Sequence, residues 1–496
     1  MKESVGPLQW TGKISPGYSL HKLFRLFLDS RYSFFLESGG SVGDFSRYSF
    51  MGSEPFLVLK SKGEQIEIFE GGKSQRLSGD PFAVLKELIS QYRLVSSGYF
   101  PFLGGAVGYF GYDLCHFVEK LPRKSVDDLE LPDCYLGFYD LVLSFDQLTG
   151  RLLISSSGFP EREPARRRKR AELRLAEALD ILKKVSGEDF SVRKEYSIPE
   201  IRSNFSRPAY LNAVEKAREY IRAGDIFQVN LSQRFCCSQT ASPFIIYEHL
   251  HRINPAPFAS FLNFPELTIV SASPERFLRI SEKKVQTRPI KGTRPRGGND
   301  LEDRRLAKEL LESEKDRAEL IMIVDLERND LGRVCEYGSV KVPELITLET
   351  HPTVFHLVST VEGVLKEDKD HIDCLKACFP GGSITGAPKI RAMEIIDELE
   401  PNQRGIYTGS IGYIGFNGET DLNIVIRTMV ITGGKIYFHA GGGIVADSDP
   451  EIEYEETLHK ARALIETLTL KKRGQATFCL EELGDVNIVG ETSSEC

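Results

Sequence analysis

The spacing between strand-like runs is the feature that most constrains the fold of this chain. Short runs rich in β-branched and aromatic residues recur along it, and most of the gaps between them have the length of a hairpin loop. Such a gap joins neighbouring antiparallel strands, because a parallel pair needs a crossover of a dozen residues or more. The pattern predicts an α+β protein of large antiparallel β-sheets with helices on the outside.

The amino-terminal part of the chain is rich in β-strand signals. Strands are predicted at 32–36, 56–59, 65–69, 109–112, 141–145 and 152–156. A basic amphipathic helix follows at about 163–185, and the polar stretch 186–207 then separates this part from the rest. We therefore predict a β-rich amino-terminal domain (1–190), a second domain (205–468) and a C-terminal tail (469–496).

The second domain combines helices and strands. Helical periodicity is found at 210–223, 301–326, 370–378, 388–399 and 450–468. Strands are predicted at 226–235, 258–264, 268–272, 276–280, 284–287, 353–362, 410–416, 422–432 and 435–440.

Composition excludes several classes of protein. A net charge of -8 argues against a general binder of nucleic acid, and no apolar run of the length needed to span a membrane is present. The first residues lack the apolar core of a signal peptide, so we expect a cytoplasmic protein. The nine cysteines are scattered without zinc-ribbon spacing.

One lysine is set in an unusual segment. Residues 289–296 read Pro-Ile-Lys-Gly-Thr-Arg-Pro-Arg, and Gly292 beside two prolines predicts a turn. A stiff turn at the end of a strand can present the amine of Lys291 as a nucleophile or as a substrate contact. The alternative is an ordinary surface lysine.

Two helices carry acidic residues at matched spacing. Asp316 and Glu319 are three residues apart, as are Glu453 and Glu456, so each pair projects from one helical face. The second pair lies close to a helix start at Ser448-Asp449-Pro450. Together the pairs would supply hard oxygen ligands for Mg²⁺, whereas separately they would be solvated surface residues.

Two glycine-rich segments, 380–389 and 440–444, are predicted to be loops. Their backbone amides could approach carboxylate groups closely. The first has the outer glycine spacing of a phosphate-binding loop, but Ala387 stands where the lysine must be, which excludes ATP binding. Arg427, on a predicted strand between these loops, could clamp a carboxylate or form an ion pair on the strand surface.

Glu275 and His356 are single titratable residues in half-apolar strands. Burial would raise the pKa of Glu275 towards use as a general acid, while His356 could equally be a core residue. No HExxH zinc motif is present, and the Gly-x-Ser-x-Gly sequence at 39–43 is not followed by a predicted helix as a nucleophile elbow requires, which argues against hydrolases and metalloproteases.

Four motifs occur in order within residues 205–468: Pro289–Arg296, Asp325–Arg333, Phe379–Arg391 and Ala440–Ser448. With these motifs the chain resembles the chorismate-utilising enzymes, which implies their fold of antiparallel sheets packed as a sandwich. The amino-terminal segments 36–39 and 46–50 are similar to the large subunits of anthranilate synthase and aminodeoxychorismate synthase.

Two positions indicate the chemistry that the resemblance implies. Gln228 stands where isochorismate and salicylate synthases have a water-activating lysine, which favours ammonia as the nucleophile. Lys291 lies in Pro-Ile-Lys-Gly-Thr, which resembles the aminodeoxychorismate branch of 4-aminobenzoate and folate synthesis, whereas anthranilate synthases typically read Pro-Ile-Ala-Gly-Thr. Anthranilate synthase component I and a non-catalytic, tryptophan-sensing relative are the alternatives.

The resemblance also implies roles for individual residues. Lys291 would attack the chorismate ring while Glu275 protonates the leaving hydroxyl, with His356 near the ring. Asp316, Glu319, Glu453 and Glu456 would hold Mg²⁺, although Asp316 replaces the glutamate common at its position. The predicted substrate contacts are Gly292, Thr293, Ser383, Tyr407, Arg427 and Gly443.

Two further partners are implied. In related proteins the amino-terminal domain binds tryptophan, and the matching residues here are Ser38, Phe45, Ser46, Arg47, Tyr48, Pro257, Phe258 and Ala259. No cysteine lies in a glutaminase motif, so a separate glutamine amidotransferase subunit is expected to supply ammonia.

Overall fold

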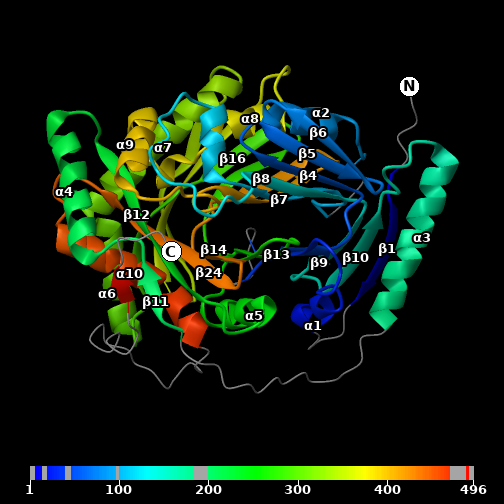
Figure 1. The fold of residues 1–496 in the computed structure, drawn as a ribbon, viewed down its shortest axis with the longest axis horizontal. Coiled ribbons are helices and arrows are strands. Elements are labelled where there is room, and N and C mark those ends of the chain that lie inside the picture. The colour runs from blue at the N-terminus through cyan, green and yellow to red at the C-terminus, as the bar shows by residue number, and fades with distance from the viewer. Residues whose placement is uncertain are drawn as a thin grey trace.

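Two large β-sheets form the body of the protein. The computed structural model describes residues 6–13, 19–39, 46–95, 100–183, 199–352, 354–469 and 488–490. Within these residues, one sheet has 13 strands and the other has 12, and every pair of neighbouring strands is antiparallel except β11 with β25. The predicted α+β fold of antiparallel sheets with helices outside is confirmed (Figure 1).

The 13-stranded sheet follows a single path with one short strand beside it. β20 (Gly386–Ala387) pairs with β12 off this path. The order along the path is β1 (Leu8–Lys13), β10 (Arg151–Ser156), β9 (Leu141–Asp146), β3 (Tyr48–Gly52), β2 (Ser33–Glu37), β13 (Phe258–Asn263), β14 (Thr268–Ser273), β23 (Thr428–Thr432), β24 (Lys435–Ile444), β12 (Gln228–Ser238), β11 (Ile201–Ser203) and β25 (Ile488–Gly490).

The 12-stranded sheet is arranged in the same way. β18 (Lys341–Thr350) pairs with β19 off the main path. The order along the path is β17 (Ile290–Pro295), β19 (Val354–Val364), β16 (Lys284–Arg288), β15 (Arg276–Ser281), β22 (Glu419–Asn423), β21 (Ser410–Gly415), β7 (Gly105–Phe110), β8 (Cys134–Tyr139), β4 (Leu57–Lys62), β5 (Gln65–Glu70) and β6 (Lys73–Ser78).

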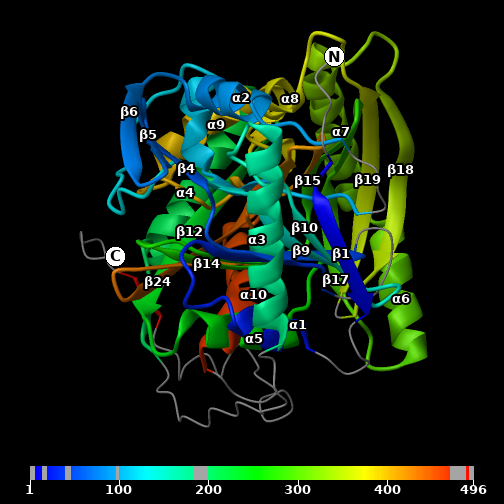
Figure 2. The same cartoon turned by 90° about the vertical axis from the view of Figure 1, so that its right-hand side faces the viewer.

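Helices cover the outer faces of both sheets. Helices α1 (Leu20–Arg25), α5 (Pro243–Ile253) and α10 (Pro450–Thr469) pack on the 13-stranded sheet, and α3 (Pro164–Lys183) lies along its β1 edge (Figure 2). Helices on the 12-stranded sheet share its outer core. They are α2 (Pro81–Ser90), α7 (Glu314–Val334) and α8 (His371–Cys378).

The remaining helices lie nearer the edges. α4 (Arg207–Ala223) and α9 (Lys389–Leu399) pack against β12, and α6 (Asp300–Glu312) contacts β17 and β19. Two 3₁₀ turns, η1 (Tyr112–Phe117) and η2 (Gly382–Ile384), complete the described elements.

Alternating side chains explain the layered packing. Phe34 of β2 lies in the core between the two sheets, whereas the next residue, Phe35, packs under the helices on the outer face. Successive strand residues point to opposite faces, so a strand covered on both sides reads as a continuous apolar run. This accounts for strands such as β2 and β7, which are buried at every position.

Strands from both predicted domains share each sheet. β2 pairs with β13 in one sheet, and β7 pairs with β21 in the other. The predicted boundary falls largely on residues 184–198, which lie outside the described residues, as does most of the predicted tail after residue 469. The segments on either side of the boundary therefore contribute to one continuous pair of sheets.

The prediction of one continuous helix at 301–326 is wrong. It is two helices, α6 and α7, which are separated at Ser313. The backbone of Ser313 is extended, and its hydroxyl accepts a hydrogen bond from the amide of Asp316, which makes it the N-cap of α7. The break places Asp316 and Glu319 in the first turns of a new helix.

The predicted glycine loop at 440–444 is also wrong, because β24 continues to Ile444. Its last residues pair with β12, with Gly441 opposite Ser232 and Gly443 opposite Asn230. A side chain at Gly441 would begin 2.5 Å from the carbonyl oxygen of Leu231. The glycines therefore permit a close approach within a sheet instead of forming a turn.

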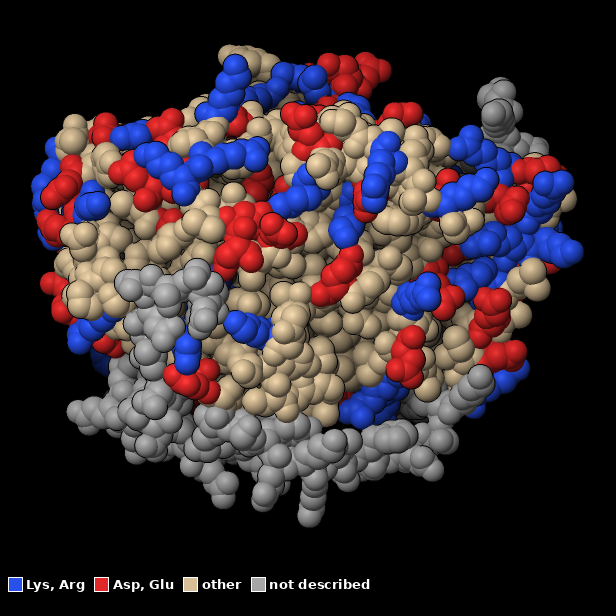
Figure 3. Space-filling view, viewed as in Figure 1, with Lys and Arg blue, Asp and Glu red and all other residues tan. Residues whose placement is uncertain are grey.

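Charged side chains of both signs are interspersed on the face shown in Figure 3, and basic residues gather where α3 lies. Many of these basic residues pair locally, as Arg168 does with Glu172 and Arg170 with Asp140. The small residues Ala171 and Ala178 face inwards from the same helix. The prediction of an amphipathic helix with a solvated basic start is confirmed.

In the part of the chain that the structure describes, we find no helix that is both long enough and apolar enough to cross a membrane.

Candidate active site

Lys291 lies on an edge strand and not in the predicted turn. β17 runs from Ile290 to Pro295 and pairs with β19, with a bulge between Lys291 and Thr293. Gly292 supplies the positive φ of 71° at this bulge. Pro289 precedes the strand and Pro295 ends it. Both are tolerated because the outer edge of β17 pairs with no other described strand and needs no backbone N–H donor there.

The amine of Lys291 is largely removed from solvent. Its side chain is 11% exposed, and Nζ lies 3.8 Å from Oε2 of Glu319. Burial lowers the pKa of Lys291, although the neighbouring charge of Glu319 opposes this effect. The neutral amine, which is the nucleophilic form, is therefore more populated than in an exposed lysine.

Glu275 is a buried carboxyl group beside the same strand. It lies between β14 and β15, its Oε1 accepts a hydrogen bond from the amide of Ile290 at 3.4 Å, and Ser383 of η2 also contacts it. Burial raises the pKa of Glu275 to about 7, against the smaller opposing effect of Ser383. The residue can hold a proton near neutral pH, as a general acid requires.

Three of the four acidic residues lie beside two glycines. A side chain at Gly442 would begin 3.2 Å from carboxylate oxygens of both Glu453 and Glu456, and one at Gly292 would begin 2.9 Å from Cγ of Asp316. The predicted helix start of α10 is confirmed, because Asp449 accepts hydrogen bonds from the first amides of that helix. The glycines leave room for carboxylates from α7 and α10.

Cations neutralise part of this acidic set. Arg294 pairs with Asp316 at 3.2 Å, Lys291 with Glu319 at 3.8 Å, and Lys460 with Glu456 at 2.6 Å. Burial raises the pKa of Glu319. Burial would also raise the pKa of Glu456, but Lys460 lowers it overall.

One carboxylate oxygen in this set has no partner. Ser448 donates to Oε1 of Glu453 at 2.6 Å, while Oε2 of Glu453 is buried without a hydrogen bond among the described residues. Burial raises the pKa of this carboxyl group. An unpaired hard oxygen fits a cation such as Mg²⁺, which retains waters and does not require a close protein cage.

A second group of polar residues faces the site from β17 and β19. The hydroxyl of Thr293 is 2.9 Å from Nδ1 of His356. Burial lowers the pKa of His356 to about 3, and the charges of His351 and Arg427 add to this effect. His356 is therefore neutral, so it can orient a group by hydrogen bonding but cannot supply a positive charge.

Arg427 is an unpaired cation at this wall of the site. It does not lie on a strand as predicted, because the chain turns between β22 and β23 with a φ of 53° at Arg427. Among the described residues, no ion pair or hydrogen bond involves its guanidinium group, and burial lowers its pKa. Tyr407 is close enough for their charges to interact. A half-buried guanidinium without a partner is suited to an anionic ligand.

Gln228 and Gly443 form the base of the site. The side chain of Gln228 is buried, and its Oε1 has no hydrogen bond among the described residues. A side chain at Gly443 would begin 2.0 Å from Nε2 of Gln228 and 3.5 Å from Nζ of Lys291. The side-chain amide of Gln228 and the amine of Lys291 therefore meet beside Gly443, where β24 carries no side chain.

The structure brings together residues that we predicted separately and adds others. Lys291, Glu275, His356, Gly292, Thr293, Ser383, Tyr407, Arg427, Gly443 and the four acidic residues are linked by the contacts above. Sequence reasoning missed Lys460 and Glu327, although both follow predicted residues at helical spacing, four after Glu456 and eight after Glu319.

Glu327 is buried close to Glu275. Its Oε2 has no hydrogen bond among the described residues. Burial raises the pKa of Glu327 well above its usual value, and the nearby Glu275 adds to the effect. The raised pKa favours the protonated carboxyl group in the folded protein.

Replacing Glu327 by glutamine is expected to stabilise the protein increasingly as pH rises. Between the ordinary pKa of the unfolded chain, about 4.5, and the raised pKa of the folded chain, the unfolded wild type releases this proton while the folded wild type keeps it, so over that range the wild type loses up to about 1.4 kcal/mol per pH unit. The variant has no such loss. Melting temperatures of both proteins between pH 6 and pH 8 test this, and a constant difference would contradict it.

A separate cavity lies between the two sheets. It measures about 90 Å³, and its lining includes six of the eight residues that we predicted for tryptophan, namely Ser38, Arg47, Tyr48, Pro257, Phe258 and Ala259. Ser46 lines a neighbouring cavity of about 190 Å³, which shares Pro257 and Phe258 with the first. Phe45 lies outside the described residues.

The fold and sequence match known proteins over most of the chain. The profile of the family described as chorismate binding enzyme matches residues 36–466. A solved structure of anthranilate synthase component I from Streptococcus pneumoniae has a TM-score of 0.76 and 34% identity, and the match covers 86% of this chain and 93% of that one. The menaquinone-specific isochorismate synthase MenF of Escherichia coli shares the fold at a TM-score of 0.69, with 18% identity and coverage of 95% and 96%.

Curated relatives carry two different names. Anthranilate synthase component 1 of Acetivibrio thermocellus is 43% identical over 90% of this chain and 92% of its own length. Aminodeoxychorismate synthase component 1 is 41% identical in both Bacillus subtilis, over 86% and 90%, and Escherichia coli, over 88% and 93%. These identities do not distinguish between the two named activities. They do show the family: this chain belongs to the chorismate binding enzyme family and is a chorismate-utilising enzyme.

Proposed function

We propose that this chain is the large subunit of an aminodeoxychorismate synthase, which makes 4-amino-4-deoxychorismate from chorismate and ammonia. The observation that carries the proposal is the buried amine of Lys291, which lies beside Glu319 and close to the base of the site at Gly443. A solvent-excluded amine with a lowered pKa is suited to covalent catalysis.

In the first step, Nζ of Lys291 forms a bond to C2 of the ring. The ring double bonds shift, the C4–O bond breaks, and the hydroxyl leaves as water with the proton of Glu275. The lysine nitrogen then loses a proton. Because the pKa of Glu275 is raised to about 7, this residue can carry the required proton near neutral pH.

In the second step, ammonia adds at C4 and the bond between C2 and Lys291 breaks. Lysine recovers a proton, and Glu275 is reprotonated from the added ammonia. The sum is chorismate plus ammonia giving 4-amino-4-deoxychorismate plus water, with the enolpyruvyl group retained. His356 and Thr293, joined at 2.9 Å, would orient the ring without changing charge.

Arg427 is proposed to bind the enolpyruvyl carboxylate together with Tyr407 and the backbone of Gly443. Arg427→Ala should raise KM for chorismate by about 10- to 100-fold with a smaller change in kcat, because charge-assisted hydrogen bonds are worth about 1.5–3 kcal/mol. Steady-state kinetics test this. The control is Arg222→Ala, whose side chain is 51% exposed and pairs with Glu215. An unchanged KM would remove Arg427 from the substrate site.

Magnesium is proposed to be held by Asp316, Glu319, Glu453 and Glu456, where its charge would attract the ring carboxylate of chorismate. The unpaired oxygen of Glu453 and the space at Gly442 fit this assignment. Asp316, the shortest of the four side chains, already pairs with Arg294 and would act through water.

Glu453→Gln should weaken Mg²⁺ binding by about 10-fold or more, since it removes one charge from a four-carboxylate set. Calorimetric titration with Mg²⁺ measures this without relying on activity. Glu455→Gln on the same helix is the matched control. Equal Mg²⁺ affinity in all three proteins would contradict the assignment.

Ammonia is proposed to come from a glutamine amidotransferase subunit, in line with relatives named component 1. The purified chain can be tested alone by supplying chorismate, Mg²⁺ and an ammonium salt, with and without the lyase that forms 4-aminobenzoate. Product that this lyase converts to 4-aminobenzoate supports the proposal. Anthranilate with release of pyruvate would support the second candidate, anthranilate synthase component I, which the 43% identical relative favours. No product would indicate a non-catalytic relative.

The cavity between the sheets is proposed to bind tryptophan. Aromatic and proline side chains line it together with Arg47 and Ser38. Calorimetric titration with tryptophan should show binding that Ser38→Phe abolishes by filling the cavity. Equal heats for tryptophan and for phenylalanine would argue against a specific site.

A further inference from the structure

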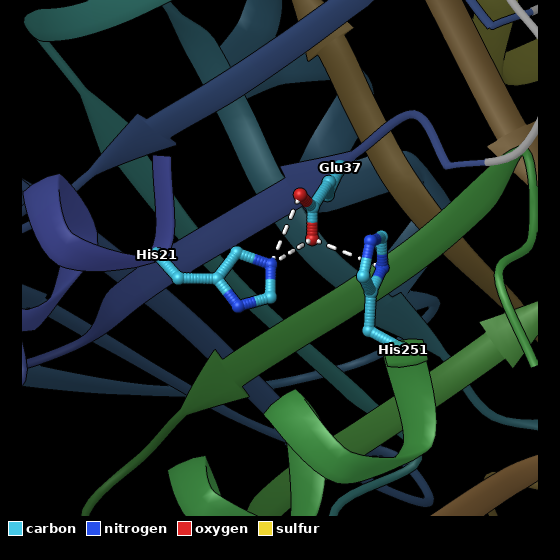
Figure 4. Close-up of side chains that lie close together, drawn as sticks. All are labelled: His21, Glu37 and His251. Carbon is cyan, nitrogen blue, oxygen red and sulfur yellow. Dashed lines mark hydrogen bonds and ion pairs between the residues drawn. The ribbon is translucent and has the colours of Figure 1, made fainter. Parts of the chain in front are cut away.

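Two histidines and a glutamate meet on the outer side of the 13-stranded sheet. His21 comes from α1, Glu37 from the end of β2 and His251 from α5, and Figure 4 shows both imidazole rings directed at the carboxylate. Nε2 of His21 lies 3.1 and 2.9 Å from the two oxygens of Glu37, and Nδ1 of His251 lies 3.2 Å from Oε2. One potential ligand atom from each residue falls within 4.8 Å of the others.

A second set of contacts fixes the orientation of these side chains. The other ring nitrogen of His21 lies 3.7 Å from Glu248, which Arg25 holds through two hydrogen bonds of 3.2 and 2.5 Å. Tyr247 donates a hydrogen bond of 2.6 Å to Glu37. Histidine ligands of metals are commonly oriented in this way, by a carboxylate on the nitrogen that does not bind the ion.

The nitrogen of His251 that faces Glu37 is not satisfied within the protein. Nδ1 is buried and makes no hydrogen bond among the described residues, despite its short distance to Oε2 of Glu37. Gly39 leaves space for this ring, because a side chain there would begin 3.0 Å from Cε1 of His251. A buried ring nitrogen that makes no hydrogen bond and lies beside a carboxylate oxygen can, in its neutral form, direct a lone pair at a cation shared with that oxygen.

We propose that His21, Glu37 and His251 form a binding site for a divalent transition metal, with Zn²⁺ as the best-matched ion. Two imidazole nitrogens and one carboxylate oxygen are preferred zinc ligands, whereas Mg²⁺ prefers oxygen alone. The side chains of His21, Glu37 and His251 are 17%, 8% and 23% exposed, so an ion can enter from solvent and keep a water as its fourth ligand.

This site is separate from the proposed magnesium site, whose carboxylates lie on α7 and α10. Without an ion, His21 forms a charged pair with Glu37 and Glu248: burial alone would lower the pKa of His21, but these two carboxylates raise it to about 9. An incoming ion must therefore displace a proton.

The ion would connect α1 and α5 beside the cavity between the sheets. Glu37 is among the residues that line that cavity, and Ser38 follows it directly. The amide of Gly39 also donates to the carbonyl of Ala256, next to Pro257 of the cavity wall. Bound Zn²⁺ would thus fix two segments that line this cavity.

The test uses the full chain, stripped of metal with a chelator and kept in saturating Mg²⁺ so that Zn²⁺ does not occupy the acidic set. Zn²⁺ bound per chain is then measured at pH 8 by competition with a chromogenic chelator. The wild type should bind one equivalent more than His21→Gln or His251→Gln. His459→Gln, at an exposed position on α10, is the matched control and should bind as the wild type does.

Equal Zn²⁺ uptake by the wild type and both triad variants would overturn the proposal. A second measurement on the wild type covers the case in which a variant fails to fold. Zn²⁺ should raise its melting temperature by at least about 2 °C in saturating Mg²⁺, and Co²⁺ should give the visible absorption of a site with nitrogen ligands. Absence of both signals would equally reject the site.

Discussion

Replacing Lys291 by alanine is expected to abolish the covalent adduct and to lower the formation of 4-amino-4-deoxychorismate by at least about 10²-fold, because the variant lacks the proposed nucleophile. The wild type incubated with chorismate and Mg²⁺, but without ammonia, should accumulate an adduct whose mass equals the protein plus chorismate less water. Intact-protein mass spectrometry measures it directly. Lys308→Ala, at a side chain that is 73% exposed, is the matched control.

The outcome for Lys291→Ala separates two roles of this residue. If the adduct persists in the variant, Lys291 is not the nucleophile. If the adduct disappears while the variant converts chorismate to anthranilate and pyruvate, the substrate site remains competent and Lys291 decides the position of amination. Circular dichroism must show that the variant is folded, which is expected because removal of this side chain leaves the backbone pairing of β17 with β19 intact.

Glu275→Gln is expected to reduce kcat by about 10²- to 10⁴-fold, the usual contribution of a general acid. Glutamine keeps the shape of the side chain and can still contact Ser383, but it has no proton to transfer. The change should therefore appear in kcat more than in KM. Similar kcat values for variant and wild type would exclude the general-acid role.

The pH dependence of the wild type provides a second test of Glu275. Since its pKa is raised to about 7, the proton is present below pH 7 and is lost as pH rises through that value. The rate of adduct formation should fall above about pH 7, and Glu275→Gln should lack this fall. At lower pH the rate should also fall, because less of Lys291 is in the neutral, nucleophilic form. The plot of rate against pH is therefore expected to be bell-shaped.

Local sequence patterns predicted the elements that lie within one segment. The three-residue spacing of Asp316 with Glu319, and of Glu453 with Glu456, correctly placed each pair on one helical face, because that geometry depends on helix periodicity alone. The alternation of strands and short gaps likewise predicted antiparallel sheets. These features need no information about distant residues.

Long-range pairing and backbone exceptions could not be predicted in the same way. The extension of β24 to Ile444 depends on its partner β12, and the bulge at Gly292 depends on β19. Gly292 is equally compatible with a turn and a bulge, so the local sequence could not decide between them. Among the described residues no carboxylate pairs with Arg427, and the sequence around Arg427 does not reveal this, because it depends on which distant segments the fold brings near.

The histidine and glutamate triad shows the same limit over a longer range. His21 and His251 are separated by 230 residues of sequence; His21 is the one histidine of α1, and His251 is one of two histidines in α5. They meet because β2 pairs with β13, which brings α1 and α5 to the same face. A ligand set assembled by strand pairing has no local spacing by which it could be recognised.

Because a block of early strands meets a block of late strands in each sheet, at β2 with β13 and at β7 with β21, the order of synthesis matters for this protein. When β2 leaves the ribosome, more than 200 residues must still be added before its neighbour β13 is made. The separation in sequence between β7 and its neighbour β21 is larger still. Open strand edges attract other chains, and pairings this distant close slowly. Both sheets can therefore be completed only after the carboxyl-terminal strands emerge, and until then the open edges of β2 and β7 favour association with other chains.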